Sequence, residues 1–359
     1  MSLRVFLTVI LLSASHGAQA SERSFPTFGS WSVSCGNTGF CSTATFVRDQ
    51  STWLDIRLVR DWPANALPML RIAANTPLNG EGTLRFAIDG KAVEALPITQ
   101  LREFQPSVIS PAGFRPIGGE GFWYPTGPST DAMIKSMRDG LTLQVELPGA
   151  DGIKTINISL IGLHQALSWM DERQAQTGTV GALAETGESP AVDAPHATSV
   201  TTVVSLPPAV MATWQNNNVC SDIDPAIFAS SDAISVSLDN KTTLFILPCG
   251  TPTAHNSAYV ALHLVEGSKA RHVSLAQMTD LGPIATGVLY NARWNPKNLE
   301  LTALFKGSGL GECGKWNRWK WVNSNFVLLE EAARPTCDGI ETDVSQWPAT
   351  WPVVTVGRE

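Results

Sequence analysis

The chain has 359 residues, of which 43% are hydrophobic and 16% are charged, and its formal net charge is −7. The hydrophobic share excludes a largely disordered chain, and the acidic balance excludes the overall positive field of a typical nucleic-acid-binding protein. The length predicts two domains of ordinary size.

The first twenty residues have the pattern of a secretory signal peptide. A positive charge at Arg4 precedes an apolar run over residues 5–12, and small residues then end in Ala18-Gln19-Ala20. The apolar run is too short to span a bilayer, which needs about 20 apolar residues. We therefore expect cleavage near Ala20 and a protein that is periplasmic or secreted. No later stretch predicts a transmembrane segment, so the cleaved chain is expected to be soluble.

Residues 21–185 predict an N-terminal domain rich in strands. Apolar and polar residues alternate in four runs bounded by turn residues, at positions 31–35, 54–58, 84–88 and 141–147, and isoleucines mark a fifth strand at positions 153–158. A short helix is expected over residues 129–139, with Ser129 or Thr130 as its N-cap. A second helix, with Ser159 as its expected N-cap, has one apolar stripe formed by Leu160, Leu163, Leu167 and Met170.

Residues 186–208 contain four prolines and many small residues without a helical period, which predicts an interdomain linker. Residues 209–359 predict a second β-rich domain, with one short helix over residues 225–229. Its expected strands are 234–238, 244–247, 259–265, 288–293, 299–305, 319–321 and 326–329. The predicted fold class is mainly β with a few helices (α+β): two β-sandwich or barrel-like domains, the first ending in an amphipathic helix.

The six cysteines all lie after the predicted cleavage site. An even number of cysteines in an exported chain predicts disulfides, and six cysteines allow 15 pairings. Proximity in sequence favours Cys35–Cys41, Cys220–Cys249 and Cys313–Cys337. A metal site is not predicted, because no C-x-x-C spacing occurs.

Several motifs resemble the bacterial family known as domain of unknown function 1176. They are Trp31 to Cys35 with Cys41, the stretch ALSWMDERQAQTGTVGAL at residues 166–183, FKGSGLGECG at residues 305–314, and Trp319 to Trp321 before Asn325-Phe326. The family commonly has Gly-Arg at Ala175-Gln176, Arg at Ser308 and Asp at Glu312. The opening motif and residues 158–167 also resemble the invasion-associated locus B family, which implies an exported β-rich domain with a late helix. Neither resemblance implies a reaction, so no catalytic residue is carried over.

The segment Lys315 to Trp321 interleaves basic and aromatic residues. Indole rings stack on sugar faces, and Arg and Lys hold acidic groups, so Trp316, Arg318, Trp319, Lys320 and Trp321 are a candidate binding platform. The alternative is a plain hairpin, since Trp319 and Trp321 share one face of a strand and the basic residues take the other. In that case the indoles pack inward and the basic side chains are solvated. Nucleic acid is not an expected partner.

No cofactor is expected. Gly309, Gly311 and Gly314 fit the dinucleotide spacing G-x-G-x-x-G, but that site needs a helix after the glycines, and the following residues predict strands. The glycines instead predict a tight loop that places Cys313. The motifs G-x-S-x-G, H-E-x-x-H and the P-loop do not occur in the sequence, so no catalytic residue is named.

Two functions follow as hypotheses. The leading one is a non-enzymatic envelope protein that binds a partner protein or a glycan. The alternative is a hydrolase acting on envelope material, built from acidic residues and histidines that only the fold assembles. Its candidates in the second half are Asp222, Asp224, His255, His263 and His272, while Glu330 and Glu331, as strand neighbours, are expected to point to opposite faces.

Overall fold

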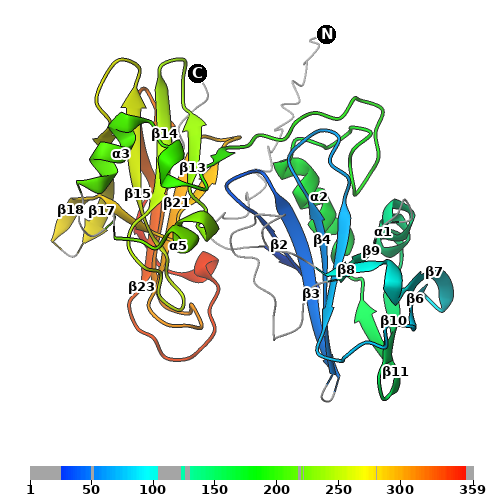
Figure 1. Cartoon of the computed structure of the whole chain (residues 1–359). Coiled ribbons are helices and arrows are strands. Elements are labelled where there is room, and N and C mark those ends of the chain that lie inside the picture. Colours follow the sequence, from blue (N-terminus) through cyan, green and yellow to red (C-terminus); the bar gives the residue numbers. More distant parts are fainter. Residues whose placement is uncertain are drawn as a thin grey trace, which may run out of the picture.

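The computed structural model describes residues 26–49, 52–103, 123–125, 130–216, 220, 222–279 and 281–352, so the predicted signal peptide lies outside the described residues. Antiparallel strands dominate the described part of the chain, and four α-helices accompany them (Figure 1). The prediction of a mainly β fold with a few helices is confirmed, and no sheet formed by these residues closes into a barrel. Among the described helices, none has the length and apolar character needed to cross a membrane.

The N-terminal half contains two sheets that share one hydrophobic core with helices α1 (Thr130–Asp139) and α2 (Leu163–Arg173). The seven-stranded sheet has the order β1-β2-β3-β4-β5-β9-β8 and the four-stranded sheet the order β11-β10-β6-β7. The strands are β1 (Thr27–Phe28), β2 (Trp31–Cys35), β3 (Cys41–Asp49), β4 (Thr52–Arg60), β5 (Met69–Ala74), β6 (Thr83–Ile88), β7 (Lys91–Pro97), β8 (Leu101–Glu103), β9 (Trp123–Pro125), β10 (Thr142–Gly149) and β11 (Gly152–Ser159).

The C-terminal half contains a six-stranded sheet, a five-stranded sheet and a separate hairpin, with helices α3 (Pro208–Gln215) and α5 (Pro225–Ser230). The six-stranded sheet is formed by β12 (Thr198–Ser199), β13 (Ile234–Ser237), β14 (Thr242–Pro248), β15 (Ala258–Val265), β16 (Arg271–His272) and β19 (Val288–Tyr290). The hairpin is β17 (Leu275–Thr279) and β18 (Gly282–Thr286), and the five-stranded sheet is β20 (Arg293–Asn295), β21 (Glu300–Lys306), β22 (Gly314–Val322), β23 (Asn325–Arg334) and β24 (Ala349–Trp351).

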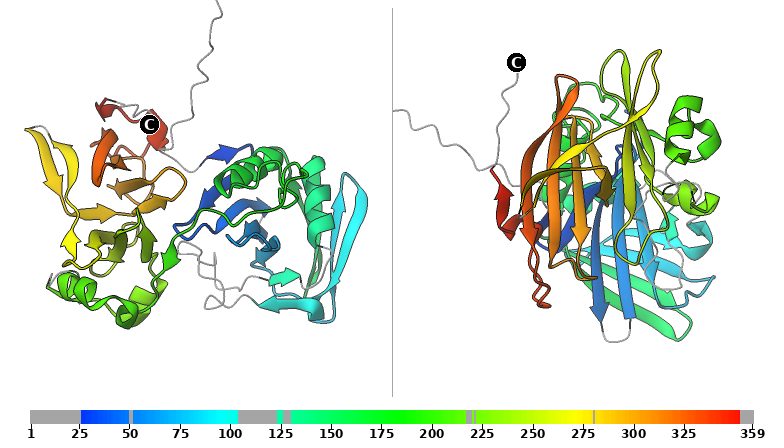
Figure 2. Two further views of the ribbon diagram at one scale, coloured as in Figure 1. Left: turned by 90° about the horizontal axis from the view of Figure 1, so that it is seen from above. Right: turned by 90° about the vertical axis from the view of Figure 1, so that its left-hand side faces the viewer.

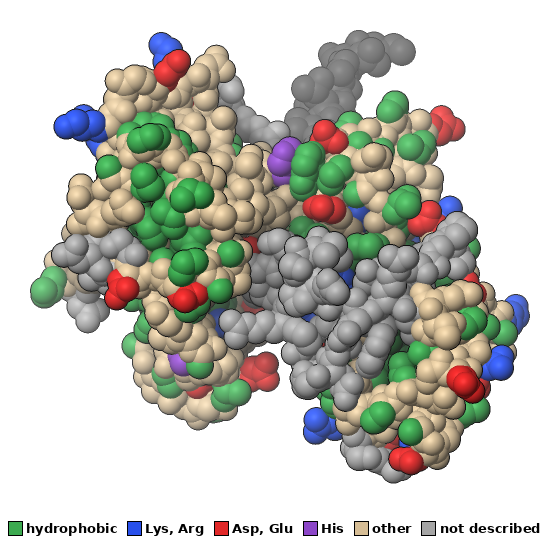
Figure 3. Space-filling model, in the orientation of Figure 1, with side chains coloured by type: hydrophobic (Ala, Val, Ile, Leu, Met, Phe, Trp, Pro, Cys, Tyr) green, Lys and Arg blue, Asp and Glu red, His purple; other side chains and the backbone are tan. Residues whose placement is uncertain are grey.

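The run Leu244-Phe-Ile-Leu247 in β14 shows how the C-terminal half is layered. Leu244 and Ile246 face the core between the two large sheets, while Phe245 and Leu247 face a second core beneath α3 and α5. Because successive side chains of a strand point to opposite faces, a strand buried on both sides has a continuous apolar sequence. Helix α3 buries Val210 and Trp214 in the second core, and Figure 3 shows further apolar side chains over α3 at the surface.

Two helix predictions need correction. The amphipathic helix does not begin after Ser159, because Ser159 is the last residue of β11 and α2 begins at Leu163. The chain turns at Gly162, whose φ is 97°, and a Cβ there would lie 1.9 Å from the carbonyl oxygen of Phe28. In the second half the expected helix at residues 225–229 is present as α5, but α3 was not predicted. Its Pro207-Pro208 start resembles a linker, although proline is well suited to the first turn of a helix.

The three disulfides join the cysteine pairs that proximity favoured, Cys35–Cys41, Cys220–Cys249 and Cys313–Cys337. The glycine-rich segment before Cys313 is the turn between β21 and β22, and β22 follows it in place of a helix. A Cβ at Gly314 would lie 1.9 Å from the carbonyl oxygen of Phe305, so only glycine fits there. The segment therefore serves the turn and the disulfide, as predicted.

Residues 186–208, the predicted linker, contact both halves. Trp62 accepts a backbone hydrogen bond from Ala194, and its ring stacks on His196 at a centroid distance of 3.7 Å. Farther along, β12 pairs with β13, and Val200 and Leu206 are buried in the core beneath α3. The boundaries of the two domains stay a prediction.

The end of α2 is fixed by a buried carboxylate. Asp171 is 2% exposed, and it accepts hydrogen bonds from the backbone of Leu183 and Ala184 and from Arg60, whose Nη2 lies 2.8 Å from Oδ1. Burial lowers the pKa of the Arg60 guanidinium, and the charge of Asp171 acts in the opposite direction. The pair therefore joins α2 to β4 and to residues 183–184, which follow the helix.

Replacing Asp171 with Ala should lower the free energy of unfolding by about 3 kcal/mol, because it leaves a buried cation and two backbone donors without their acceptor. Urea unfolding of the purified protein measures the loss. Asp151→Ala, at an exposed turn, is the control and should change the midpoint little. Equal midpoints for both variants would contradict the role given to Asp171.

Candidate functional site

The two halves are joined by the side chain of Asn37, which lies in the loop between β2 and β3 that the Cys35–Cys41 disulfide closes. Asn37 is fully buried, and its Oδ1 accepts a hydrogen bond of 2.8 Å from the backbone of Trp294 in β20. Its Nδ2 donates to the carbonyl oxygens of Ala292 and Asp232 at 3.4 and 3.5 Å. Figures 1 and 2 show β2 and β3 on the side of the N-terminal half that faces the C-terminal half.

The same loop is held from behind by α2. Gln174, which is 1% exposed, donates from Nε2 to the carbonyl oxygen of Gly39 at 2.8 Å, and its Oε1 accepts from Arg60 at 2.7 Å. Gln174 follows Asp171 by three residues, so the helix end that locks β4 also positions the loop. The disulfide and the glutamine leave the loop few conformations, and Asn37 is therefore presented to the other half in a fixed orientation.

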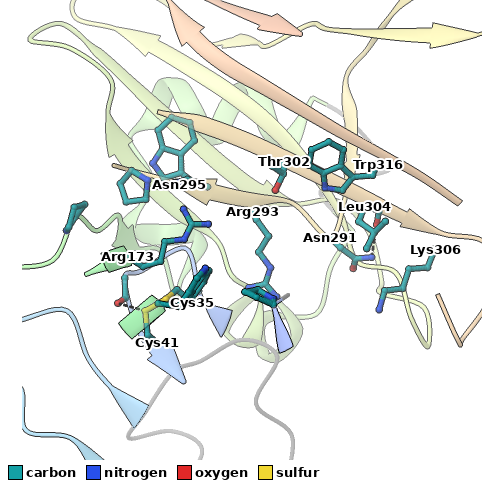
Figure 4. A pocket seen from close by; sticks show the side chains of 17 residues that line it. Cys35, Cys41, Arg173, Asn291, Arg293, Asn295, Thr302, Leu304, Lys306 and Trp316 are labelled. Carbon is teal, nitrogen blue, oxygen red and sulfur yellow. Dashed lines mark hydrogen bonds between the residues drawn. A yellow bond between two sulfur atoms is a disulfide. The ribbon is translucent and has the colours of Figure 1, made fainter. Parts of the chain in front are cut away.

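A pocket of about 240 Å³ opens beside this junction, and both halves line it (Figure 4). The N-terminal half supplies the Cys35–Cys41 disulfide together with Trp169 and Arg173 of α2. The C-terminal half supplies residues of three neighbouring strands, Arg293, Trp294, Thr302, Leu304, Lys306 and Trp316. Figure 4 shows Arg173 and Arg293 between the disulfide and the strands that carry Thr302 and Trp316.

The lining of the pocket is cationic. Among the described residues that line it, the charged ones are Arg173, Arg293 and Lys306. Arg173 lies over the ring of Trp169, with Cζ 4.9 Å from the ring centroid, and Arg293 pairs with Asp232 at 3.6 Å. Asp232 offsets part of the charge of Arg293. An anionic or neutral polar ligand therefore suits it better than a cation.

Comparison with known proteins shows the family. The family model described as "Protein of unknown function (DUF1176)" matches residues 25–354. The chain belongs to the DUF1176 family. The uncharacterized protein YpfG of Escherichia coli (strain K12) is 27% identical over 349 residues, which cover 90% of this chain and 91% of that protein. The solved structure of invasion associated protein b from Bartonella henselae is 20% identical, with a TM-score of 0.30, and the match covers 42% of this chain and 97% of that one.

Two of the motifs that carry the DUF1176 resemblance lie at the junction. The stretch 166–183 contains Trp169, Asp171, Arg173 and Gln174, which form the helix end, the loop support and one wall of the pocket. The stretch 305–314 contributes Lys306 to the opposite wall. The sequence did not identify Asn37, Arg173 or Arg293 as site residues. The one available signal was the location of Asn37 and Arg173 within the motifs that carry the family resemblance, while Arg293 lies outside all of them.

The predicted platform on β22 is divided between two faces of the five-stranded sheet. Trp319 and Trp321 are buried in the core between the large sheets, while Trp316 packs on the other face with Trp347 and lines the pocket. Lys320 is half-buried beside Arg318 on the face of Trp316. Of the five platform residues, Trp316 is therefore the one that the structure places at the pocket.

The expected solvation of the basic residues is wrong for Arg318, which lies 3.2 Å from Glu330 and 3.5 Å from Glu300. Both of these carboxylates are buried. Glu331 lies on the opposite face with Lys315 and Asn317, so the two neighbouring glutamates diverge as predicted. They form separate ion pairs and not an acid–base pair.

Three residues of the hydrolase hypothesis have positions that the structure explains without catalysis. Asp224 caps α5 by accepting from the backbone of Ala226. His263 and His272 pair with different partners across β15 and β16, so they point to opposite faces. Burial lowers the pKa of His263, and Arg271 acts in the same direction.

Replacing Asn37 with Ala should weaken the junction by about 2 kcal/mol, because the backbone of Trp294 loses its acceptor in a buried site. We expect faster amide exchange at residues 292–295 and an earlier unfolding transition, measured by hydrogen exchange and calorimetry. Asn157→Ala, at an exposed position of β11, is the matched control. Unchanged exchange in the Asn37 variant would show that the junction does not depend on this side chain.

Proposed function

We propose that this protein is an exported, non-enzymatic binding protein of the bacterial envelope, and that the pocket beside Asn37 takes a glycan. The observation that carries the proposal is the lining of this pocket, where indole surface and cationic side chains from both halves meet. Indole rings pack against the C–H faces of sugar rings, and guanidinium groups donate to their oxygen atoms. The pocket belongs to the junction, so the ligand contacts both halves at once.

The size of the pocket favours a glycan over a partner protein. A stable protein–protein interface buries about 1,600 Å² of surface, whereas a pocket of about 240 Å³ takes a group of the size of one sugar unit. Hydrolysis of a glycan commonly needs two carboxyl groups flanking the bond. The described residues that line this pocket supply indoles, amides and cations, and this composition suits binding.

Export is supported by the first twenty residues and by the cysteines. The charged start, the apolar run and the Ala18-Gln19-Ala20 ending together form the cleavage pattern. All six cysteines are paired, as suits an oxidising compartment. Reduced cytosolic conditions would leave the loop that carries Asn37 without its disulfide.

Thr302→Trp should abolish glycan binding, because the indole fills the pocket from β21. Co-sedimentation of the purified protein with insoluble peptidoglycan measures binding, and we expect a loss of at least tenfold in affinity. Thr155→Trp, at an exposed position of β11, is the control and should bind as the unmodified protein does. Undiminished binding by the Thr302 variant would place the glycan elsewhere, and absence of binding by the unmodified protein would reject this glycan.

The accumulated protein should begin at Ser21. Intact-mass measurement of the protein recovered from a periplasmic extract tests this prediction, and replacing Ala18 and Ala20 with Tyr should leave the leader attached, since the cleavage site needs small residues. Recovery of the full 359-residue chain from cells making the unmodified protein would contradict export by this route.

A further inference from the structure

A second pocket, of about 470 Å³, is lined by residues of two hairpin turns in the C-terminal half. One turn joins β13 to β14 and supplies Asp239 and Lys241, and the other joins β22 to β23 and supplies Ser324. His263 of β15 and Trp321 of β22 also line the pocket. Among the described residues, this lining and that of the pocket beside Asn37 have no member in common, so the two pockets are separate.

Trp321 brings an indole N–H group to this pocket without an acceptor in the described part of the chain. Its side chain is 8% exposed and packs in the core against Phe326, with the ring centroids 5.1 Å apart. Four other buried indoles donate to backbone carbonyl oxygens, namely those of Trp31, Trp214, Trp319 and Trp347. The Nε1 atoms of Trp294 and Trp351 also lack an acceptor, but protein encloses them, whereas Trp321 Nε1 is not enclosed. A buried indole N–H commonly has a partner, so a ligand in the pocket is a natural acceptor for Trp321.

Two further groups of the lining form hydrogen bonds of known sense. Asp239 Oδ1 accepts from the backbone N–H groups of Lys241 and Thr242 at 2.9 and 2.8 Å, and these bonds lower the pKa of the carboxyl. The carboxylate is therefore a fixed, ionised acceptor, and it has more acceptor sites than these bonds use. Burial and the charge of Arg271 lower the pKa of His263, so near neutral pH its imidazole offers one donor and one acceptor.

Ser324 lies at a position of the turn that favours glycine. Asn323 and Ser324 have φ values of 48° and 65°, and Val322 pairs with Asn325, which together define a two-residue hairpin turn of the primed kind. Asn-Gly is the preferred sequence for such a turn, because a side chain disfavours the left-handed conformation. The serine adds a hydroxyl group that lines the pocket.

The composition of the lining indicates an uncharged ligand that is rich in hydroxyl groups. The charges of Asp239 and Lys241 cancel, so the lining does not favour an anion over a cation. Donors and acceptors stand side by side, as suits hydroxyl groups, which are both at once. Val265 and the indole of Trp321 add apolar surface for the C–H face of a sugar ring. The volume is about twice that of the pocket beside Asn37 and takes one or two sugar units.

We propose that this pocket is a second sugar site, which takes an uncharged sugar unit on Asp239, His263 and the indole N–H of Trp321. The proposal goes beyond the proposed function, because the described lining of this site belongs to the C-terminal half alone and does not depend on the pocket beside Asn37. A few hydrogen bonds hold one sugar unit with a dissociation constant on the order of millimolar. This site by itself is therefore too weak to retain the protein on insoluble peptidoglycan.

The indole N–H signals in the NMR spectrum of the ¹⁵N-labelled protein test this site. Titration with N-acetylglucosamine should shift the signal of Trp321, which Trp321→Phe identifies by its disappearance. The signal of Trp319 should stay in place, because Trp319 Nε1 donates to the carbonyl oxygen of Ala276 at 2.7 Å. N-acetylglucosamine 6-phosphate should bind no more tightly than the uncharged sugar, since the lining has no net charge to attract it.

Variants locate the sugar. His263→Ala should weaken binding about fivefold by removing a hydrogen bond, and His263→Gln should retain more of the affinity, because the amide also offers a donor and an acceptor. His272→Ala is the matched control, since His272 lies on the opposite face of the sheet and is exposed. Thr302→Trp, which fills the pocket beside Asn37, should leave the Trp321 shift unchanged. Dispersed signals of the remaining indoles show that each variant folds.

A Trp321 signal that N-acetylglucosamine does not move would overturn the second site, whatever the sedimentation with peptidoglycan shows. Unchanged affinity in folded His263→Ala, or loss of the shift in folded Thr302→Trp, would also overturn it, since the sugar would then be bound elsewhere. Tighter binding of the phosphate would reject the uncharged class of ligand. If the unmodified protein does not sediment with peptidoglycan while the Trp321 signal shifts as expected, the proposed function fails and the second site stands.

Discussion

One buried amide makes three hydrogen bonds between the two halves. The side-chain oxygen of Asn37 accepts one hydrogen bond from the backbone of the C-terminal half, and its NH₂ group donates two. The side chain is fully buried. A buried amide is stabilising only when its partners are all in place, since each unpaired donor or acceptor costs about 1–3 kcal/mol. The junction therefore tolerates few relative orientations. The disulfide-closed loop and Gln174 behind it supply the rigidity that such a contact needs.

The end of α2, which supports this loop, places several structural contacts in residues 171–176. Three side chains at this helix end each bind a different segment. Asp171 binds Arg60 and residues 183–184, Gln174 binds the loop at Gly39, and Gln176 binds the carbonyl oxygen of Val192. Between them, Ala175 has a φ of 55°, a left-handed conformation that glycine adopts more readily than alanine. The alanine strains the turn by about 1 kcal/mol, and the surrounding hydrogen bonds maintain it. The other two departures, Ser308 and Glu312, contact each other, since the serine hydroxyl donates a hydrogen bond to the carboxylate.

Local patterns in the sequence predicted what is local in the structure. Alternation found the strands with one buried face, and proximity found the three disulfides. Helix α3 was missed because Pro207-Pro208 is read equally well as a linker, and the start of α2 was misplaced because a strand residue, Ser159, has the chemistry of a cap. Local sequence patterns did not predict the pocket. Arg173 and Arg293 lie in different halves, and neither stands in a pattern that distinguishes a ligand contact from a solvated cation. The sequence marked Trp316 as a candidate because basic and aromatic residues surround it. Strand alternation places Trp316 and Trp319 on opposite faces, but the sequence does not show that both faces of the sheet are buried.

The location of the pocket at the junction links binding to the arrangement of the halves. A ligand that contacts both halves stabilises the joined arrangement by RT ln(1 + [L]/Kd), which is about 2.7 kcal/mol at a hundredfold excess over Kd. Asn37 holds the two walls of the pocket in place before the ligand arrives, which lowers the entropy lost on binding. The contact between the two halves is therefore most stable when the pocket is occupied. The disulfide-closed loop and the end of α2 keep Asn37 in the position that this contact needs.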